Sequence, residues 1–332
     1  GRTFKLMEQL ELKDVRLVYA PPRGVGDYGG EEDNFRWPRH TGDFTVLRAY
    51  VSAEGKPAPF ARENVPYRPK TWLRVAPKGI SEGDVAMIAG YPGRTQRFLT
   101  PSAVANLERW FYPLRSRTFT DLIAILESEG KKDEATALKV ASAVKSYGNG
   151  ETNARGQIEG LARNGVLARA ESEAKELAEF LAARKDLPAA WAAAPAELEK
   201  VLARDREGQE RRFFLSEVER LNGHLSSALS AVRRADERKK PDLDREAGFQ
   251  ERDLDRARQR EKDLTRSLAP AASRKALAYL VAKTQAASGA MPVKAFDEAF
   301  GKGAGVEAIE AKLAEMDAAT TLGDEKVRVA NV

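Results

Sequence analysis

The character of the sequence changes at Thr100-Pro101-Ser102, and this change limits the folds that the chain can adopt. Before it, short runs of alternating and β-branched residues are separated by Gly and Pro turns, a pattern typical of antiparallel strands. After it, apolar residues recur every three or four positions, which indicates amphipathic helices. The sequence therefore predicts an α+β protein, with a strand-rich domain at residues 1–100 and a large all-α domain at residues 101–332.

The first hundred residues contain four segments with strand character. Residues 44–51 alternate most clearly, and residues 14–19 and 72–75 are further runs of the same kind. A fourth, apolar segment lies between the Gly83-Asp84 turn and Gly90-Tyr91-Pro92-Gly93. A Gly-Asp turn that leads into an apolar strand is typical of small antiparallel barrels.

The remaining sequence predicts a series of helices whose apolar stripes form the core of a bundle. Tyr147-Gly148-Asn149-Gly150 is a strong stop signal for a helix that begins near Lys132. Long helices at residues 206–238 and 243–268, with Pro241 between them, predict an antiparallel hairpin. The alternative for these stripes is a coiled-coil-like arm that contacts a second subunit. Other helices are expected near residues 101–114, 119–126, 153–184, 189–202, 273–287, 292–300 and 306–318.

Composition excludes several classes of protein. The 332 residues include no cysteine, which excludes disulfides, thiolate nucleophiles and zinc–thiolate sites. Lys+Arg 55 against Asp+Glu 50 is a near-balanced mixture without a long block of one sign, so solvated helix faces explain it better than nucleic-acid binding. No apolar run reaches the length of about 18 residues that a membrane span needs. We expect no metal and no cofactor, because HExxH, calcium-loop and Walker patterns do not occur.

One polar stretch, residues 33–43, directly precedes the clearest predicted strand. Asp43 ends this stretch, so its carboxylate is expected at the rim of a sheet, on a loop shaped by Pro38 and Gly42. A carboxylate in such a place can orient a histidine, which is the role of the acid in a serine-hydrolase triad. The alternative is a turn cap or an ion pair with Arg39.

Three motifs in this part of the chain resemble a known family. They are Val-Arg-Leu-Val-Tyr-Ala-Pro-Pro at residues 15–22, Trp-Pro-Arg-His-Thr-Gly-Asp-Phe at 37–44 and Gly-Tyr-Pro-Gly-Arg-Thr at 90–95. In this order they are similar to the dipeptidyl-peptidase 7 and 11 family of bacterial serine exopeptidases. The resemblance implies part of a chymotrypsin-like β-barrel followed by a helical domain that covers the active cleft. It also implies a periplasmic or secreted protein, with the signal peptide outside this chain.

The resemblance implies roles for individual residues. Asp43 matches the catalytic acid, whereas the family's histidine precedes the matched region and its serine lies well beyond it. Asn34 and Phe35 match an asparagine and an aromatic residue that bind the free α-ammonium of the substrate, although the family commonly has tryptophan at the second position. Asn149 matches an asparagine of the helical part with the same role, with Asn153 as the second choice. The structural alternative for Asn149 is a helix C-cap.

Two histidines occur, His40 and His224, and neither is expected to be the catalytic base. We therefore expect a middle fragment of a serine dipeptidyl-peptidase that is inactive by itself. Its expected partners are a peptide substrate, the His- and Ser-bearing remainder of the parent chain, and a second copy in a homodimer. The alternative is a helical interaction or dimerisation module without catalysis. Arg36, Arg39 and Arg94 are expected to form structural ion pairs with nearby acids or, alternatively, to favour acidic substrates.

Overall fold

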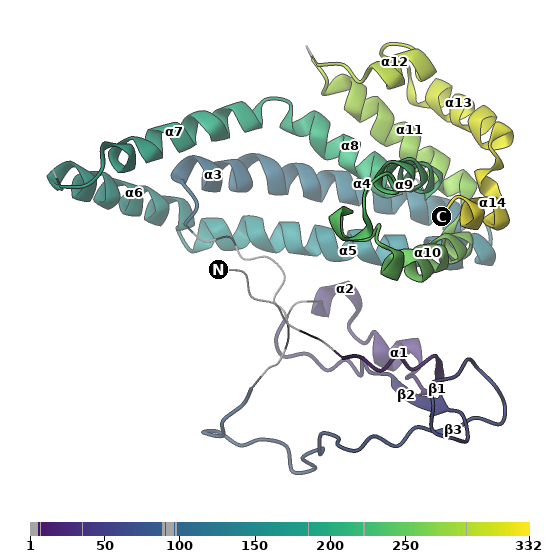
Figure 1. Cartoon of the computed structure of the whole chain (residues 1–332). Coiled ribbons are helices and arrows are strands. Elements are labelled where there is room, and N and C mark those ends of the chain that lie inside the picture. Colours follow the sequence, from purple (N-terminus) through teal and green to yellow (C-terminus); the bar gives the residue numbers. More distant parts are fainter. Residues whose placement is uncertain are drawn as a thin grey trace. The chain divides into compact units, whose positions relative to one another are not determined.

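We analysed a computed structural model of the chain, which describes residues 6, 8–34, 36–87, 90, 96, 98–184, 186–221, 223–289 and 291–332. It divides into two compact units, residues 1–96 and 97–332. The first, here called the strand unit, holds a three-stranded antiparallel sheet, and the second, the helical unit, is built from helices (Figure 1).

The sheet of the strand unit contains the two strands that alternate most clearly in the sequence. β1 (Asp14–Tyr19) pairs antiparallel with β2 (Val46–Val51), and β2 pairs with the short β3 (Val65–Pro66). Two short helices, α1 (Arg23–Gly26) and α2 (Gly30–Asp33), lie in the connection between β1 and β2. The strands predicted at 14–19 and 44–51 are therefore confirmed, although the second one begins only at Val46.

The other two predicted strands are wrong for the residues that the structure describes. Residues 72–75 and 84–87 are irregular and pair with no strand of the described sheet. The side chains of Leu73 and Val85 are almost fully exposed. A strand needs a neighbour for its backbone hydrogen bonds, so an apolar run without one stays irregular. Residues 91–95, which include most of the third motif, lie outside the described residues.

An ion pair between the partly exposed Arg16 and the buried Asp14 ties β1 to the segment before β3. Arg16 donates to both carboxylate oxygens of Asp14, at 3.0 and 2.7 Å. Arg16 also donates to the Ala61 carbonyl at 2.8 Å, and Asn64 Nδ2 donates to Asp14 Oδ2 at 2.8 Å. The hydrogen bond from Arg16 is the main reason why the pKa of Asp14 is lowered to about 2, against the opposing effect of burial. This network holds the sheet together where few apolar side chains are buried.

The helical unit begins with a continuous rod of α3, a π-helical turn and α4, and α5 runs alongside α4 (Figure 1). Thr100 caps this rod, because its hydroxyl accepts a hydrogen bond from the Ala103 amide. Asp133 caps α5 in the same way through the Thr136 amide. The elements are α3 (Pro101–Asn106), η1 (Leu107–Phe111), α4 (Tyr112–Gly130), α5 (Glu134–Arg163), α6 (Val166–Ala183), α7 (Ala189–Arg206), α8 (Gln209–Leu221), α9 (Gly223–Glu237), η2 (Asp242–Asp244), η3 (Glu251–Asp253), α10 (Leu254–Ser267), α11 (Pro270–Ala286), α12 (Lys294–Phe300), α13 (Val306–Ala319), η4 (Thr321–Gly323) and α14 (Glu325–Ala330).

The core of the helical unit lies between α4, α5, α8, α11 and α13. Leu122 of α4, Leu280 of α11 and Ile309 of α13 are completely buried there. Aromatic rings fill the contact between α4, α5 and α8: Phe119 meets Tyr147 edge-on, with 5.0 Å between the ring centroids. The prediction of a large all-α region with a bundle core is confirmed.

The helix stop predicted at Tyr147-Gly148-Asn149-Gly150 is wrong. α5 continues through these residues to Arg163, and the break comes at Asn164-Gly165, where Gly165 has a φ of 57°. Residues 153–163 therefore belong to α5 rather than to the helix predicted at 153–184. A stop signal expresses a local preference, and here the packing of α5 along α4 overrides it.

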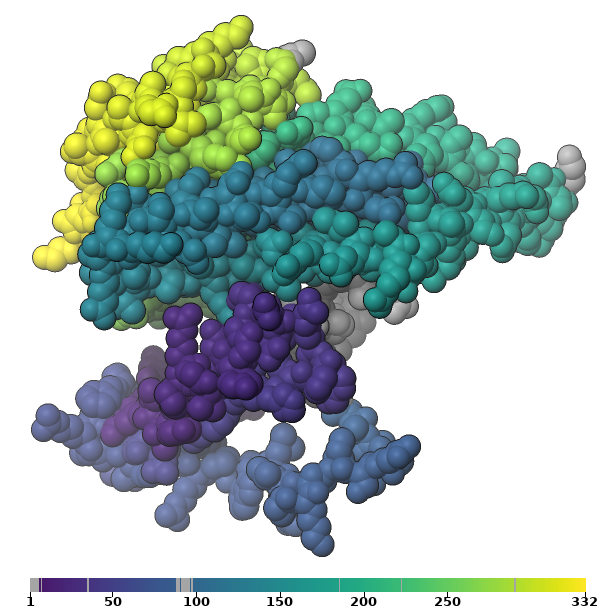
Figure 2. All heavy atoms as spheres, turned by 180° about the vertical axis from the view of Figure 1, so that it is seen from behind, coloured from purple at the N-terminus to yellow at the C-terminus, as the bar shows by residue number. Residues whose placement is uncertain are grey.

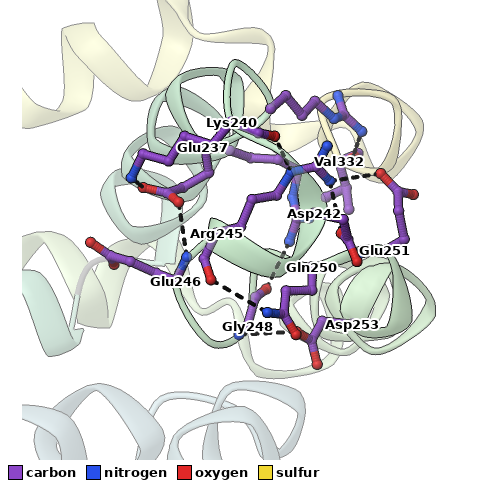
Figure 3. Close-up of polar contacts among 12 residues, drawn as sticks. Glu237, Lys240, Asp242, Arg245, Glu246, Gly248, Gln250, Glu251, Asp253 and Val332 are labelled. Carbon is purple, nitrogen blue, oxygen red and sulfur yellow. Dashed lines mark hydrogen bonds and ion pairs between the residues drawn. The ribbon is translucent and has the colours of Figure 1, made fainter.

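The long hairpin predicted at 206–238 and 243–268 is replaced by shorter elements. The first half is α8 and α9, and the second half begins only at Leu254. The segment between α9 and α10 is a loop held by polar contacts (Figure 3). Glu237 accepts hydrogen bonds from Lys240 at 2.6 Å and from the Glu246 amide at 2.9 Å. Arg245 pairs with Glu251 at 2.8 Å, so side chains stabilise a loop where periodicity predicted helix.

α6 and α7 extend past the rest of the helical unit and form its narrow end (Figures 1 and 2). Their facing apolar side chains do not close on each other and leave an open groove of about 880 Å³. Leu177 of α6 and Trp191 and Leu198 of α7 line it, and each is about half exposed.

Candidate active site

The loop before β2 carries Asp43, and contacts with the α1 segment hold this loop. The Gly42 amide donates to the Val25 carbonyl at 3.0 Å, and Thr41 Oγ1 donates to the Tyr28 carbonyl at 3.0 Å. A Cβ atom at residue 42 would lie 2.8 Å from the exposed Val25 side chain and 3.6 Å from its carbonyl oxygen, so the loop packs directly on the α1 segment.

The Asp43 carboxylate is exposed three residues before the start of β2. In the part of the chain that the structure describes, it accepts no hydrogen bond and forms no ion pair. The predicted alternative of an ion pair with Arg39 is not formed, because Arg39 Nε instead donates to Thr41 Oγ1 at 3.0 Å. The side chain thus lies at a strand start with its acceptor atoms open to solvent.

Asn34 directly follows α2 as its C-cap residue and is buried, with 7% of its surface exposed. Its Nδ2 donates to Glu31 Oε2 at 3.1 Å, and its Oδ1 accepts from Arg39 Nη1 at 3.5 Å, the limit of a hydrogen bond. Since Arg39 also contacts Thr41, it connects Asn34 with the loop of Asp43. The structure therefore links Asn34 through Arg39 to Thr41, two residues before Asp43.

The other predicted residues of this region are only partly described. Phe35 and Arg94 lie outside the described residues. Among the described residues Arg36 has no ion pair, and Arg39 bonds to an amide and a hydroxyl rather than to an acid. The expectation of structural ion pairs is therefore wrong for Arg36 and Arg39.

Asn149 belongs to the helical unit, where it lies in the interior of α5 and is half-buried. It is not a helix C-cap, because α5 continues for fourteen further residues to Arg163. Asn153, the second choice, lies one turn further along the same helix and is exposed. Both amides lie on the same side of α5, since residues four apart are neighbours on a helix surface.

A buried polar cluster at Tyr147, two residues before Asn149 in the sequence, was not predicted. The Tyr147 hydroxyl lies 3.2 Å from Glu217 Oε2 of α8, and both residues are buried. Arg220 lies 3.4 Å from the same oxygen and donates to Ser146 Oγ at 2.8 Å. Burial raises the pKa of the Glu217 carboxyl, and Arg220 opposes this. In sequence, Glu217 and Arg220 resemble an ordinary surface pair three residues apart, so only the tertiary contact reveals them.

Neither histidine forms a catalytic arrangement in the described residues. His40 is exposed. His224 lies with Nδ1 3.6 Å from Asp317 Oδ1, beside a cavity of about 220 Å³ that Ser273 also lines. No hydrogen bond joins Ser273 Oγ to His224 among the described contacts, so a Ser-His pair is not formed there.

The described residues contain no group of three or more His, Cys, Asp and Glu side chains that could hold a metal ion. Within the same residues, no helix combines the length and apolar character that a bilayer crossing demands.

Comparison with known proteins finds one peptidase family and relatives that are dipeptidyl-peptidases. The family model for peptidase S46 matches residues 1–332. An Asp/Glu-specific dipeptidyl-peptidase from Shewanella putrefaciens is 37% identical over 254 residues, which are 76% of this chain and 34% of the relative. Dipeptidyl-peptidase 7 from Capnocytophaga gingivalis is 40% identical over 161 residues, 48% of this chain and 22% of the relative.

Solved structures share the fold. The crystal structure of Porphyromonas endodontalis DPP11 in complex with the dipeptide Arg-Glu aligns with a TM-score of 0.61 at 24% identity. The alignment covers 96% of this chain and 52% of that chain. The chain thus spans about half of this solved chain and between 22% and 34% of the curated relatives named above.

Proposed function

This chain belongs to the peptidase S46 family, and from this membership we propose that it supplies the catalytic acid to a serine dipeptidyl-peptidase that removes dipeptides from the N-termini of peptides. In this proposal Asp43 is the acid. The histidine base and the serine nucleophile come from polypeptide outside these 332 residues, in a periplasmic or secreted enzyme.

The observation that carries the proposal is the exposed Asp43 carboxylate at the start of β2, without a partner among the described residues. A triad acid accepts a hydrogen bond from the imidazole Nδ1–H, which holds the ring in the correct tautomer and stabilises its charge during catalysis. A carboxylate whose oxygens are open to solvent is available for this hydrogen bond. The Gly42–Val25 and Thr41–Tyr28 contacts supply the rigid support that such a group needs.

Asn34 offers an acceptor for the amino terminus of a substrate. An α-ammonium needs acceptors, and the Asn34 amide oxygen can supply one, since it accepts from Arg39 Nη1 at 3.5 Å in this structure. In this proposal the substrate ammonium binds at that oxygen, and Phe35 and Asn149 keep the roles in recognising the amino terminus that the family resemblance implies. Fixing the ammonium fixes the distance to the scissile bond, which makes the enzyme an exopeptidase.

The exposed sheet supports the idea that further polypeptide completes the strand unit. Leu17 and Leu47, which face each other in the β1–β2 register, are both more than half exposed. Apolar side chains on a sheet are normally covered, so we propose that additional strands pack here and complete a chymotrypsin-like barrel. This would also bring the missing histidine and serine towards Asp43.

The test is steady-state kinetics on the longest native polypeptide that includes these residues, with dipeptidyl chromogenic substrates. Asp43→Asn is expected to lower kcat about 10⁴-fold, as in other triads that lose their acid. His40→Ala, three residues away and exposed, is the matched control and is expected to leave the rate unchanged. Full activity of Asp43→Asn, or full activity of the 332-residue chain alone, would contradict the proposal.

The second candidate function is self-association through the helical unit, and the open groove between α6 and α7 favours it. Leu177, Trp191 and Leu198 expose apolar surface there, as interfaces do. A homodimer that covers the groove is expected to lose affinity on Trp191→Ser. Light scattering on the whole chain that shows a strict monomer at high concentration would exclude it.

A further inference from the structure

We propose that Gly150 and Tyr147 are positioning residues for substrate recognition: they fix the rotation of α5 and thereby aim the Asn149 amide. This inference rests on the proposed role of Asn149 in binding the substrate's amino terminus. Neither residue needs to contact the substrate. They act through the helix that carries Asn149.

The spacing of residues on α5 separates a buried face from a presenting face. Tyr147, Gly150 and Ala154 lie three and four positions apart and are all buried. At about 100° per residue, Asn149 lies on the side of the helix away from Tyr147. Asn149 is half-buried and Asn153 is exposed on that side. The direction of Asn149 is therefore set by how the opposite face of α5 is locked.

Gly150 sets how closely α5 approaches α4. A Cβ atom on residue 150 would lie 2.4 Å from Phe119 Cε2 and 2.7 Å from Phe119 Cδ2, far inside van der Waals contact. The Phe119 ring cannot move away easily, because it is buried and packs against Tyr147 at 5.0 Å and Phe213 at 6.5 Å between centroids. Any side chain at residue 150 must therefore displace α5 itself.

Tyr147 sets the rotation of the same turn. Its hydroxyl lies 3.2 Å from Glu217 Oε2, so α5 is tied to α8 at this point. Arg220 covers the Tyr147 ring at 4.5 Å and donates to Ser146 Oγ at 2.8 Å, which ties the preceding residue to the same helix. The turn that carries Asn149 is thus packed against α4 at Gly150 and bonded to α8 at Tyr147.

A displacement of this turn directly affects binding of an ammonium group. Relieving the contact at residue 150 requires a movement of about 1 Å, since ordinary contacts begin near 3.4 Å. An amide oxygen binds an ammonium group over a window of only about 0.5 Å, so a movement of this size removes the hydrogen bond. We therefore expect Gly150→Ala and Tyr147→Phe to lower kcat/KM by about tenfold, mainly through KM.

The test is a double-mutant cycle in the longest native polypeptide that includes these residues. It compares Gly150→Ala, Tyr147→Phe and Asn149→Ala, singly and in pairs, with thermal unfolding as the check on folding. Gly156→Ala is the matched control, because it lies in α5 with nothing within 4 Å of its added Cβ. Its kcat/KM is expected to equal that of the wild type. In the Asn149→Ala background the two positioning variants are expected to cause no further loss.

The outcomes separate this inference from the proposed function. If Asn149→Ala keeps full activity, the proposed role of Asn149 fails and this inference fails with it. If Asn149→Ala loses activity while Tyr147→Phe and Gly150→Ala keep theirs, Asn149 binds substrate but the positioning role is overturned. The positioning role is also overturned if Gly150→Ala and Tyr147→Phe cause their full loss of kcat/KM in the Asn149→Ala background. If Gly150→Ala does not fold, Tyr147→Phe alone decides, since it removes one oxygen atom and adds no bulk.

Discussion

Replacing glycine by alanine within α5 should lower the stability of the protein at one position and raise it at two others. Gly150, Gly156 and Gly160 all lie in the interior of α5. At Gly156 and Gly160 an added Cβ meets nothing within 4 Å, whereas at Gly150 it would lie 2.4 Å from the Phe119 ring. The perturbation is therefore Gly→Ala at each site, one at a time.

The expected magnitudes follow from two effects. Alanine is better than glycine in a helix interior by about 0.5–1 kcal/mol, which is the whole effect at Gly156 and Gly160. At Gly150 the same gain is opposed by overpacking, which costs about 1–3 kcal/mol in a tight core. Because the Phe119 ring is held among Tyr147 and Phe213, we take the upper part of this range and expect a net loss of about 2 kcal/mol at Gly150.

The assay is thermal unfolding of the 332-residue chain, followed by the helical circular dichroism signal. At about 2–4 °C per kcal/mol for a unit of this size, Gly156→Ala is expected to raise Tm by about 1–4 °C, and Gly160→Ala similarly. Gly150→Ala is expected to lower Tm by about 4–8 °C. A Gly150→Ala variant as stable as the wild type would refute the close contact of α5 with α4. A Gly156→Ala variant of lowered Tm would refute the continuation of α5 beyond the predicted stop.

Further predictions concern pH and the core. Arg16 holds the pKa of Asp14 at about 2 against an ordinary value of 3.8, so the Asp14 carboxylate stabilises the fold above pH 3.8 and this stabilisation is lost as pH falls towards 2. Asp14→Asn should therefore destabilise the strand unit at neutral pH. The difference in stability between this variant and the wild type should vanish in an acid titration followed by NMR. Hydrogen bonds from Lys132 and Lys275 lower the pKa of Glu129 below its ordinary value of 4.5. Lys275→Met should therefore have a lower free energy of unfolding than the wild type at pH 7, as measured by urea titration, and this difference should narrow below pH 4.5. Leu122→Ala, at a fully buried site, should cost about 2–5 kcal/mol of unfolding free energy in urea, and a loss below about 1 kcal/mol would contradict the assigned core.

The sequence predicts those elements whose signal is local and strong. β1 and β2 are rich in β-branched and aromatic residues, and each strand pairs with the other, so both predictions are confirmed. Residues 72–75 have a similar mixture of apolar and charged residues but no neighbouring strand in the described residues. Composition alone cannot show whether a partner strand exists. The helix stop at residues 147–150 fails for a related reason: Gly-Asn-Gly is a stop only where nothing packs on it, and here Phe119 does.

In the candidate site, too, features set by neighbouring residues in the sequence could be predicted, and features set by tertiary contacts could not. A polar loop before an alternating strand was enough to predict that Asp43 lies at a strand start, and the structure has it there. The cluster of Tyr147, Glu217 and Arg220 joins residues about seventy positions apart, so no sequence window contains it. The buried state of Asn34 was also not predicted, because its partners Glu31 and Arg39 look like solvated charges in the sequence.

The central claim is that the Asp43 carboxylate serves an imidazole from another part of a longer polypeptide. An experimental structure of the longest native polypeptide that includes these residues measures this directly, as the distance from the Asp43 carboxylate oxygens to the nearest imidazole Nδ1. We predict about 2.6–3.2 Å, with the Nε2 of the same ring directed at a serine hydroxyl. A carboxylate with no imidazole within about 5 Å, or one paired with a lysine or arginine, would contradict the account.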